Sequence, residues 1–211
     1  MRIKLFIALC ITLSLMAVLG FDRFAIDAFT FTQSRQNAEA TMEKYKDVWE
    51  DRTINEAPNP YPSLNLESGK IVGTITIPKM DYYEMPIYYG SNKFNNNWQI
   101  STAGYLGNWN MFGEEGRAVV GAHNYQLFTR LPELQEGDLF LIETEQEIFI
   151  YEVLGNRIYD HLVDDWNEVA YQDSQPYSVT LMTCYPIIQG AEATQDMYMV
   201  YSKMVKGTVY K

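Results

Sequence analysis

Cys184 is the side chain in this sequence that is best suited to covalent chemistry. The chain has two cysteines, and the other, Cys10, lies in an apolar N-terminal run, so Cys184 has no partner for an intramolecular disulfide. A thiol attacks as its thiolate, and near neutral pH it needs a neighbouring acid/base group to do so. The alternative is that Cys184 fills a small space in the core, as free cysteines often do.

Histidine is the residue type that most often fills this acid/base role, and the chain has two, His123 and His161. His123 comes 184 − 123 = 61 positions before Cys184, whereas His161 lies in a polar stretch nearer to it. Either histidine could instead satisfy a local structural hydrogen bond, which is the commoner role of a single histidine. The residue types alone leave the choice of partner open.

The elements that carry these residues are predicted strands. Residues 178–183 are β-branched and apolar, and Pro186 ends the run because proline cannot continue a hydrogen-bonded ladder, so Cys184 stands at the tip of a strand. Residues 117–122 form another short apolar strand, which ends at His123. Further short runs of alternating apolar residues, with little helix between them, predict an all-β barrel or sandwich.

Three stretches together resemble the sortases, the cell-surface cysteine transpeptidases of Gram-positive bacteria. Residues 180–184, Thr-Leu-Met-Thr-Cys, resemble the sortase signature Thr-Leu-x-Thr-Cys. Residues 123–138 resemble the pattern of a Gly/Ala-His pair followed by Phe, a short Leu-containing helix and Gly-Asp. Residues 71–90 are similar to the opening of the sortase barrel, where a strand ending in Ile-Pro precedes a Pro-Ile-Tyr strand. On this resemblance His123 is the partner of Cys184, and His161 matches nothing comparable.

Two other families of cysteine enzymes fit less well. Papain-like enzymes carry the cysteine before the histidine, which is the opposite order. Bacterial L,D-transpeptidases share the order found here, but their cysteine follows a Ser-x-Gly motif, whereas Cys184 follows Thr183.

The resemblance covers residues 71–205 and implies both a fold and a reaction. The fold would be a mostly β, eight-stranded sortase-type barrel with short helices, preceded by an N-terminal transmembrane helix. The reaction would be transpeptidation, in which Cys184 attacks the Thr carbonyl of a C-terminal sorting signal like Leu-Pro-x-Thr-Gly and forms a thioester. His123 would act as general acid toward the leaving amine and as base toward the incoming amine.

The resemblance also implies the partners of this reaction. They would be surface proteins that bear the sorting signal and an amine acceptor on a peptidoglycan precursor or a pilin. We expect Thr180, Thr183 and Met197 to contact the sorting signal, and no cofactor to be required.

One position departs from the sortase pattern. Sortases carry an arginine at the start of the last strand, which is thought to donate a hydrogen bond to the substrate carbonyl or oxyanion, an interaction worth roughly 3–4 kcal/mol in other hydrolases. Met197 stands there in this chain, and no arginine follows Arg157. Gln195 shares strand parity with Met197, so we predict that its amide replaces the arginine in part. The alternative is that Gln195 only ends a loop.

The same departure keeps a second function open. A sortase-like protein without the arginine could bind sorting signals or a surface partner without turnover. Thiol reactivity would separate the two functions, because an active-site cysteine alkylates in the folded protein and a core cysteine does not.

Two pairs of acidic residues suggest a further expectation. Glu114 and Glu115 precede the histidine strand, and Asp164 and Asp165 lie in the loop before the cysteine strand. Some sortases bind calcium between corresponding regions with oxygen ligands, so Ca²⁺ between these pairs is one interpretation. Solvated surface is the commoner role of such pairs.

The rest of the chain indicates an exported, anchored protein. A formal net charge of −11 over 211 residues argues against nucleic-acid binding. Residues 5–21 are apolar and follow two basic residues, which predicts a signal anchor that leaves the remainder outside the cell. We therefore expect a membrane anchor at 1–22, a helical stalk and Pro-rich linker at 23–65 and the barrel domain at 66–211. In the stalk, Ala38, Met42, Tyr45 and Trp49 share one helical face.

Overall fold

Short strands dominate the computed structural model of the protein, which describes residues 38–90, 100–102, 110–124, 127–165, 176–186 and 196–211. The α-helices are α2 (Ala38–Lys44) and α3 (Lys46–Glu50), and the 3-10 helices are η1 (Tyr61–Ser63), η2 (Pro78–Met80) and η3 (Leu127–Glu133). The strands are β1 (Ile54–Ala57), β2 (Ile71–Ile77), β3 (Tyr82–Tyr88), β4 (Ile100–Thr102), β5 (Arg117–Gly121), β6 (Leu139–Glu143), β7 (Ile148–Tyr159), β8 (Ser178–Cys184) and β9 (Met197–Tyr210).

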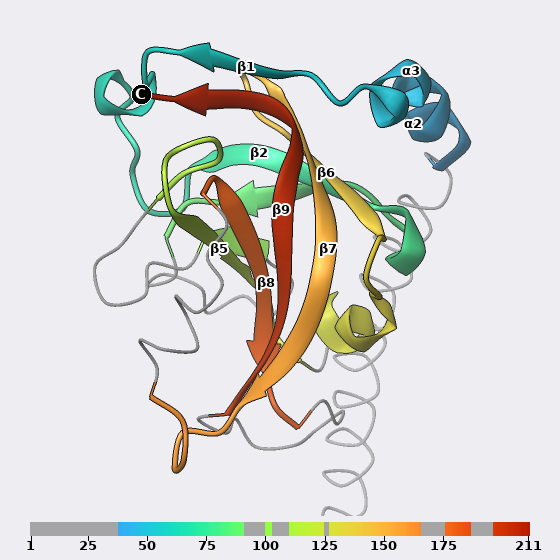
Figure 1. Cartoon of the computed structure of the whole chain (residues 1–211), viewed down its shortest axis with the longest axis vertical. Helices are drawn as coiled ribbons and strands as arrows, with labels where there is room; N and C mark the ends of the chain where they lie inside the picture. Colours follow the sequence, from blue (N-terminus) through green and yellow to red (C-terminus); the bar gives the residue numbers. More distant parts are fainter. Residues whose placement is uncertain (1–37, 91–99, 103–109, 125–126, 166–175, 187–195) are drawn as a thin grey trace, which may run out of the picture.

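Eight of these strands close on themselves. Their order is β9-β7-β6-β2-β3-β4-β5-β8, and β8 pairs again with β9, which completes a barrel. The long strands β7, β8 and β9 lie side by side (Figure 1). The predicted mostly β, eight-stranded barrel with few short helices is confirmed.

The cysteine strand β8 is covered on both faces. Val179 and Leu181 belong to the main core inside the barrel, whereas Met182 packs with Met199 of β9 on the opposite face. All residues from Ser178 to Thr183 are therefore buried, although serine and threonine stand among the apolar ones. Because side chains alternate along a strand, Cys184 shares the face of Met182, outside the main core.

The segment that we predict as stalk and linker joins the barrel from residue 38 onward. Strand β1 pairs in parallel with residues 207–210 of β9, just beyond the part of β9 that β7 covers. Tyr61 is buried, and its hydroxyl donates to the carbonyl of Phe112 over 2.8 Å. The prolines of this segment come after β1, so they do not interrupt its ladder.

The predicted helix of the stalk packs on the outside of β6 and β7. Tyr45 is 1% exposed and contacts Leu141 and Ile150, and Lys44 pairs with Glu84 and Glu143 of the barrel. The predicted helix is two short helices, α2 and α3 (Figure 1). The break lies at Tyr45, so the apolar face differs from the predicted one and Met42 is exposed.

No described helix is long and apolar enough to cross a membrane. The predicted anchor at residues 1–22 lies outside the described residues.

Gly113 offers a test of how tightly the loop before β5 packs against the C-terminal end of β9. Its φ of +86° is unfavourable for other residues, and a Cβ there would lie 2.4 Å from the Thr208 carbonyl oxygen and 2.9 Å from the Phe149 ring. We expect Gly113→Ala to lower the free energy of unfolding by about 2–5 kcal/mol, from backbone strain and overpacking.

Gly137→Ala is the matched control for this substitution. Gly137 has a φ of +89° but nothing within 4 Å of its Cβ position, so only the backbone cost of about 1–2 kcal/mol is expected. Urea unfolding of both variants measures the difference. Equal losses would show that the close approach at Gly113 is not tight.

Candidate active site

The pairing of β5 with β8 brings the two predicted catalytic residues together. These strands run parallel, and each pair, from Arg117 with Ser178 to Gly121 with Met182, is offset by 61 positions. His123 and Cys184 are offset by the same 61 positions, and both lie two residues beyond the last pair. Since neighbouring strands are about 4.8 Å apart, the histidine and the cysteine stand next to each other at one end of the barrel.

Hydrogen bonds carry the pairing past the end of the ladder. The Ala122 N–H donates to the Met182 carbonyl over 3.2 Å, and the Thr183 hydroxyl donates to the Ala122 carbonyl over 2.8 Å. Beyond His123 and Cys184, the amide of Asn124, which is 2% exposed, donates to the Pro186 carbonyl over 2.8 Å. These bonds on both sides of His123 and Cys184 fix one strand end against the other.

Burial sets the protonation states of the pair. Cys184 and His123 are both half-buried. Burial raises the pKa of the Cys184 thiol and lowers the pKa of the His123 imidazole. Near pH 7 the resting site therefore holds a thiol beside a neutral imidazole, which is the form of histidine that accepts a proton. The imidazole can take the thiol proton as the sulfur attacks and return it to a leaving group.

The raised pKa of Cys184 predicts how its alkylation depends on pH. Because burial disfavours the thiolate, we expect the iodoacetamide reaction of Cys184 to rise with a midpoint above about 8.5, the ordinary cysteine value. Mass spectrometry of peptides separates Cys184 from Cys10, and the urea-unfolded protein is the control at the ordinary midpoint. A midpoint below the ordinary value would mean that the resting site is a thiolate beside an imidazolium.

The other predicted site residues lie around this pair. Met197, the predicted counterpart of the sortase arginine, pairs directly with Cys184 across β8 and β9, and its side chain has no N–H or O–H donor. Thr183 is buried and uses its hydroxyl to hold β5. Thr180 is buried four residues before Cys184, and its hydroxyl has no hydrogen-bond partner among the described residues. Gln195 lies outside the described residues.

The structure does not bring the two predicted acidic pairs together. Glu114 forms a bridge with Tyr210 at the end of β9. Asp164 pairs with Arg157, whose partner on β9 is Met199, near the start of that strand. Eleven positions of β9 separate these two points, so the two acidic pairs lie toward opposite ends of that strand.

His161 also lies near the end of the barrel where Cys184 stands, a position that the sequence did not indicate. The Nδ1 atom of His161 is 2.6 Å from Oδ1 of Asp196, and the carbonyl of Asp196 accepts from the Tyr185 N–H over 2.8 Å. The His161 side chain and the His161 backbone N–H both bond to the Asp196 carboxylate, and these two hydrogen bonds lower its pKa. With Asp160, the pair places three possible metal ligands within 4.8 Å of one another at the surface. Nothing in the local sequence predicts this contact, because it joins two separate loops.

Known proteins share the motifs and the fold described above. The sequence model of the Sortase domain matches residues 75–205, which is more than half of the chain. The chain belongs to the sortase family. Sortase D of Bacillus subtilis (strain 168) is 26% identical to it over 192 residues, which are 90% of this chain and 93% of that protein.

Solved sortase structures share the fold. Sortase C from Clostridium perfringens SM101 has a TM-score of 0.55 and 24% identity, covering 82% of this chain and 90% of that one. The Clostridium perfringens Sortase D5 transpeptidase has a TM-score of 0.54 and 21% identity, covering 86% of this chain and 99% of that one. Sortases are cysteine transpeptidases, so the chemistry expected of the family is the chemistry that a cysteine beside a histidine can perform.

Proposed function

We propose that this sortase cleaves a C-terminal sorting signal like Leu-Pro-x-Thr-Gly and transfers the protein to an amine. The acceptor is an amine of the cell wall or of a pilin, and the predicted N-terminal anchor keeps the barrel at the outer face of the membrane. The observation that carries the proposal is the register of β5 and β8, which places His123 beside Cys184 at the strand ends.

The reaction follows from the protonation states of the pair. Neutral His123 accepts the proton of Cys184 as the sulfur attacks the Thr carbonyl, and the resulting imidazolium donates that proton to the departing amine. A thioester remains on Cys184. Deprotonated again, His123 then accepts a proton from the incoming amine as it attacks the thioester. The C–S bond breaks, and the imidazolium returns the proton to the departing Cys184 sulfur, which restores the thiol and the neutral imidazole. Thr180, Thr183 and Met197 are the proposed contacts to the sorting signal, and no cofactor enters this cycle.

The experiment that tests the proposal uses a panel of sorting-motif peptides. The protein is mixed with each peptide and a strong amine nucleophile, and mass spectrometry reads both the products and the mass of the protein. A peptide capped with the amine, together with an acyl adduct on Cys184, is the expected result. If no peptide gives a product or an adduct, although the Cys184 thiol alkylates in the folded state, turnover is contradicted.

A second candidate function is supported by Met197. This side chain faces Cys184 and cannot donate a hydrogen bond to an oxyanion, so a protein that binds sorting signals without turnover is the other function that the site supports. In that case sorting peptides slow the alkylation of Cys184 but form no adduct. Gln195→Ala tests the partial replacement that we predict for Gln195, since unchanged turnover would remove that role.

A further inference from the structure

Arg157 lies on the same outer face of the barrel as Cys184. Across β7 and β9, Arg157 pairs with Met199 and Tyr159 pairs with Met197. Paired residues of neighbouring strands present their side chains on the same face of a sheet. Met197 in turn pairs with Cys184. Arg157 therefore lies two strands away from Cys184, and two residues before the position on β7 that is level with it.

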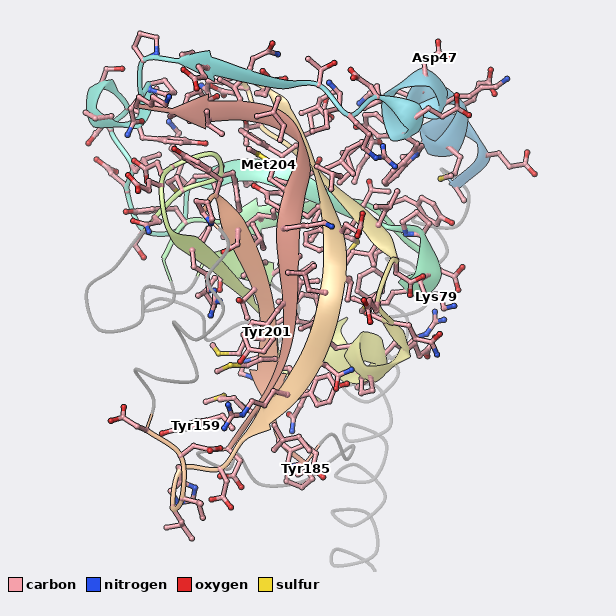
Figure 2. The ribbon with its side chains drawn as sticks, viewed as in Figure 1. Asp47, Lys79, Tyr159, Tyr185, Tyr201 and Met204 are labelled. Carbon is pink, nitrogen blue, oxygen red and sulfur yellow. The ribbon has the colours of Figure 1, made fainter. Side chains whose placement is uncertain are left out.

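The packing of the face agrees with this register. Tyr159, Met197 and Tyr201 all pack on the cluster formed by Met182 and Met199, outside the main core. Tyr159 and Tyr185 lie at the same end of the barrel, with Tyr201 farther up β9 (Figure 2). Arg157 comes two residues before Tyr159, so it belongs to this face near the catalytic end.

The guanidinium can reach the reacting atoms from this position. Two strand spacings of about 4.8 Å and two residues of about 3.3 Å place the Cα atoms of Arg157 and Cys184 roughly 12 Å apart. An extended arginine side chain spans roughly 7 Å, from six bonds of about 1.5 Å each in a zigzag. The cysteine side chain and the bound carbonyl group cover much of the remaining distance.

The ion pair of Arg157 points its side chain toward the catalytic end. Its Nη2 atom lies 2.8 Å from Oδ1 of Asp164, which follows the end of β7. Asp164 is fixed because its other carboxylate oxygen accepts from the Asp160 N–H over 2.9 Å. The neighbouring His161 is held by Asp196, which directly precedes Met197. The guanidinium is therefore held by Asp164 beyond the end of β7, which is the end of the barrel where Cys184 lies.

The described basic residues elsewhere on this part of the barrel are too distant for the same role. Arg117 pairs with Ser178, six residues before Cys184, and Lys203 lies six residues beyond Met197 on β9. Six residues of extended strand correspond to about 20 Å. Arg130 is held on η3 by Asp81, Glu133 and the carbonyls of Lys79 and Met80.

Attack on a carbonyl creates a charge that needs such a donor. As the sulfur of Cys184 bonds to the carbonyl carbon, the π electron pair of the carbonyl moves to its oxygen, which becomes an oxyanion. When the tetrahedral intermediate collapses, this pair re-forms the double bond, and the amine leaves with a proton from His123. An N–H donor with a full positive charge stabilises the oxyanion more than the neutral substrate. Such a donor therefore lowers the activation barrier of the attack step.

We propose that Arg157 is the catalytic residue that donates a hydrogen bond to this oxyanion, from β7 and across Met197. The inference rests on the proposed transpeptidase function and adds to it the residue that stabilises the transition state. The arginine of this sortase would then reach the site from a strand other than the one that carries Met197.

Full-length protein, a sorting peptide that the wild type processes and a strong amine provide the test. We expect Arg157→Ala to lower kcat by about 10²–10³-fold with little change in KM, the cost of losing one oxyanion donor. Arg157→Lys should recover part of this loss. Lys203→Ala is the matched control, because it removes another ion pair between β7 and β9, with Glu152 at 3.0 Å, and should leave kcat unchanged.

A rescue variant separates catalysis from folding. Met197→Arg added to Arg157→Ala places a guanidinium directly opposite Cys184, and we expect it to restore kcat at least tenfold. Iodoacetamide alkylation of Cys184 and the Tm should be the same in wild type and Arg157→Ala. If the Tm of Arg157→Ala falls as well, the kcat of the double variant is the deciding measurement. A restored kcat supports the inference, and a kcat that stays low overturns it.

Failure of this inference is distinguishable from failure of the proposed function. Wild-type turnover that Arg157→Ala retains would overturn the role of Arg157 and leave the transpeptidase intact, and a loss in Gln195→Ala alone would assign the donor to Gln195. An inactive wild type would remove both the reaction and the residue proposed to assist it.

Discussion

Replacing Cys184 with alanine is expected to abolish turnover of any sorting peptide that the wild type processes. The thioester forms on the sulfur, so without it the covalent route is lost, and the rate should fall by on the order of 10⁴-fold or more. The acyl adduct should disappear from the protein mass spectrum at the same time. Turnover is measured by mass spectrometry of the peptide in the presence of a strong amine.

Stability and binding are the controls for Cys184→Ala. The side chain is half-buried at the tip of β8, so its loss should cost at most about 1 kcal/mol of unfolding free energy. The peptide should still bind, since the walls of the site are unchanged. Turnover by this variant would contradict the assignment of the nucleophile. Equal peptide binding by a wild type that forms no adduct would favour the binding protein over the enzyme.

The predicted catalytic pair, His123 and Cys184, rests on the sortase resemblance, and each residue lies at a strand end that the local sequence pattern indicates. An apolar run before His123 and another before Cys184 predict the two strands without further information. The sequence does not show that β5 and β8 are neighbours in parallel register, because that pairing depends on how the whole barrel closes. The 61-residue spacing acquires its meaning only from that register, in which every β5–β8 pair has the same offset.

Other features depended on contacts between segments far apart in the chain. Strand β1 lies in a stretch that reads as linker, since three prolines follow it and only its pairing with β9 makes it a strand. Arg157 is unremarkable in the sequence, and its place on the face of Cys184 follows from two successive pairings, β7 with β9 and β9 with β8. Met197 is the first residue of β9 and pairs with Cys184, and its alignment with the sortase arginine stays a prediction.

The contact of His161 with Asp196 shows a different limit of sequence reasoning. Each residue lies in a polar loop, where charged groups are commonly solvated, and no periodicity relates the two positions. The structure joins them over 2.6 Å at the catalytic end of the barrel. Proximity to the site therefore does not by itself identify the acid/base residue, and the two histidines must be separated by experiment.

His123→Ala is expected to lower kcat by about 10²–10⁴-fold, the usual contribution of a positioned acid/base group. The sign of the pH dependence follows from burial, which lowers the pKa of His123, so the imidazole stays neutral to a pH below its ordinary value of about 6.5. Wild-type kcat/KM should therefore fall only as pH drops through this lowered pKa. The measurement is the pH profile of kcat/KM for wild type and variant with one sorting peptide.

His161→Ala is the matched control, because His161 is the other histidine at this end of the barrel but is engaged by Asp196. We expect it to change kcat by less than about tenfold, since it takes no part in the proton transfers of His123. Added imidazole should partly restore His123→Ala, as a small base can enter the space that the side chain leaves beside Cys184. A larger loss in His161→Ala than in His123→Ala would assign the proton transfers to the loop histidine, and the register of β5 and β8 would then position a structural residue.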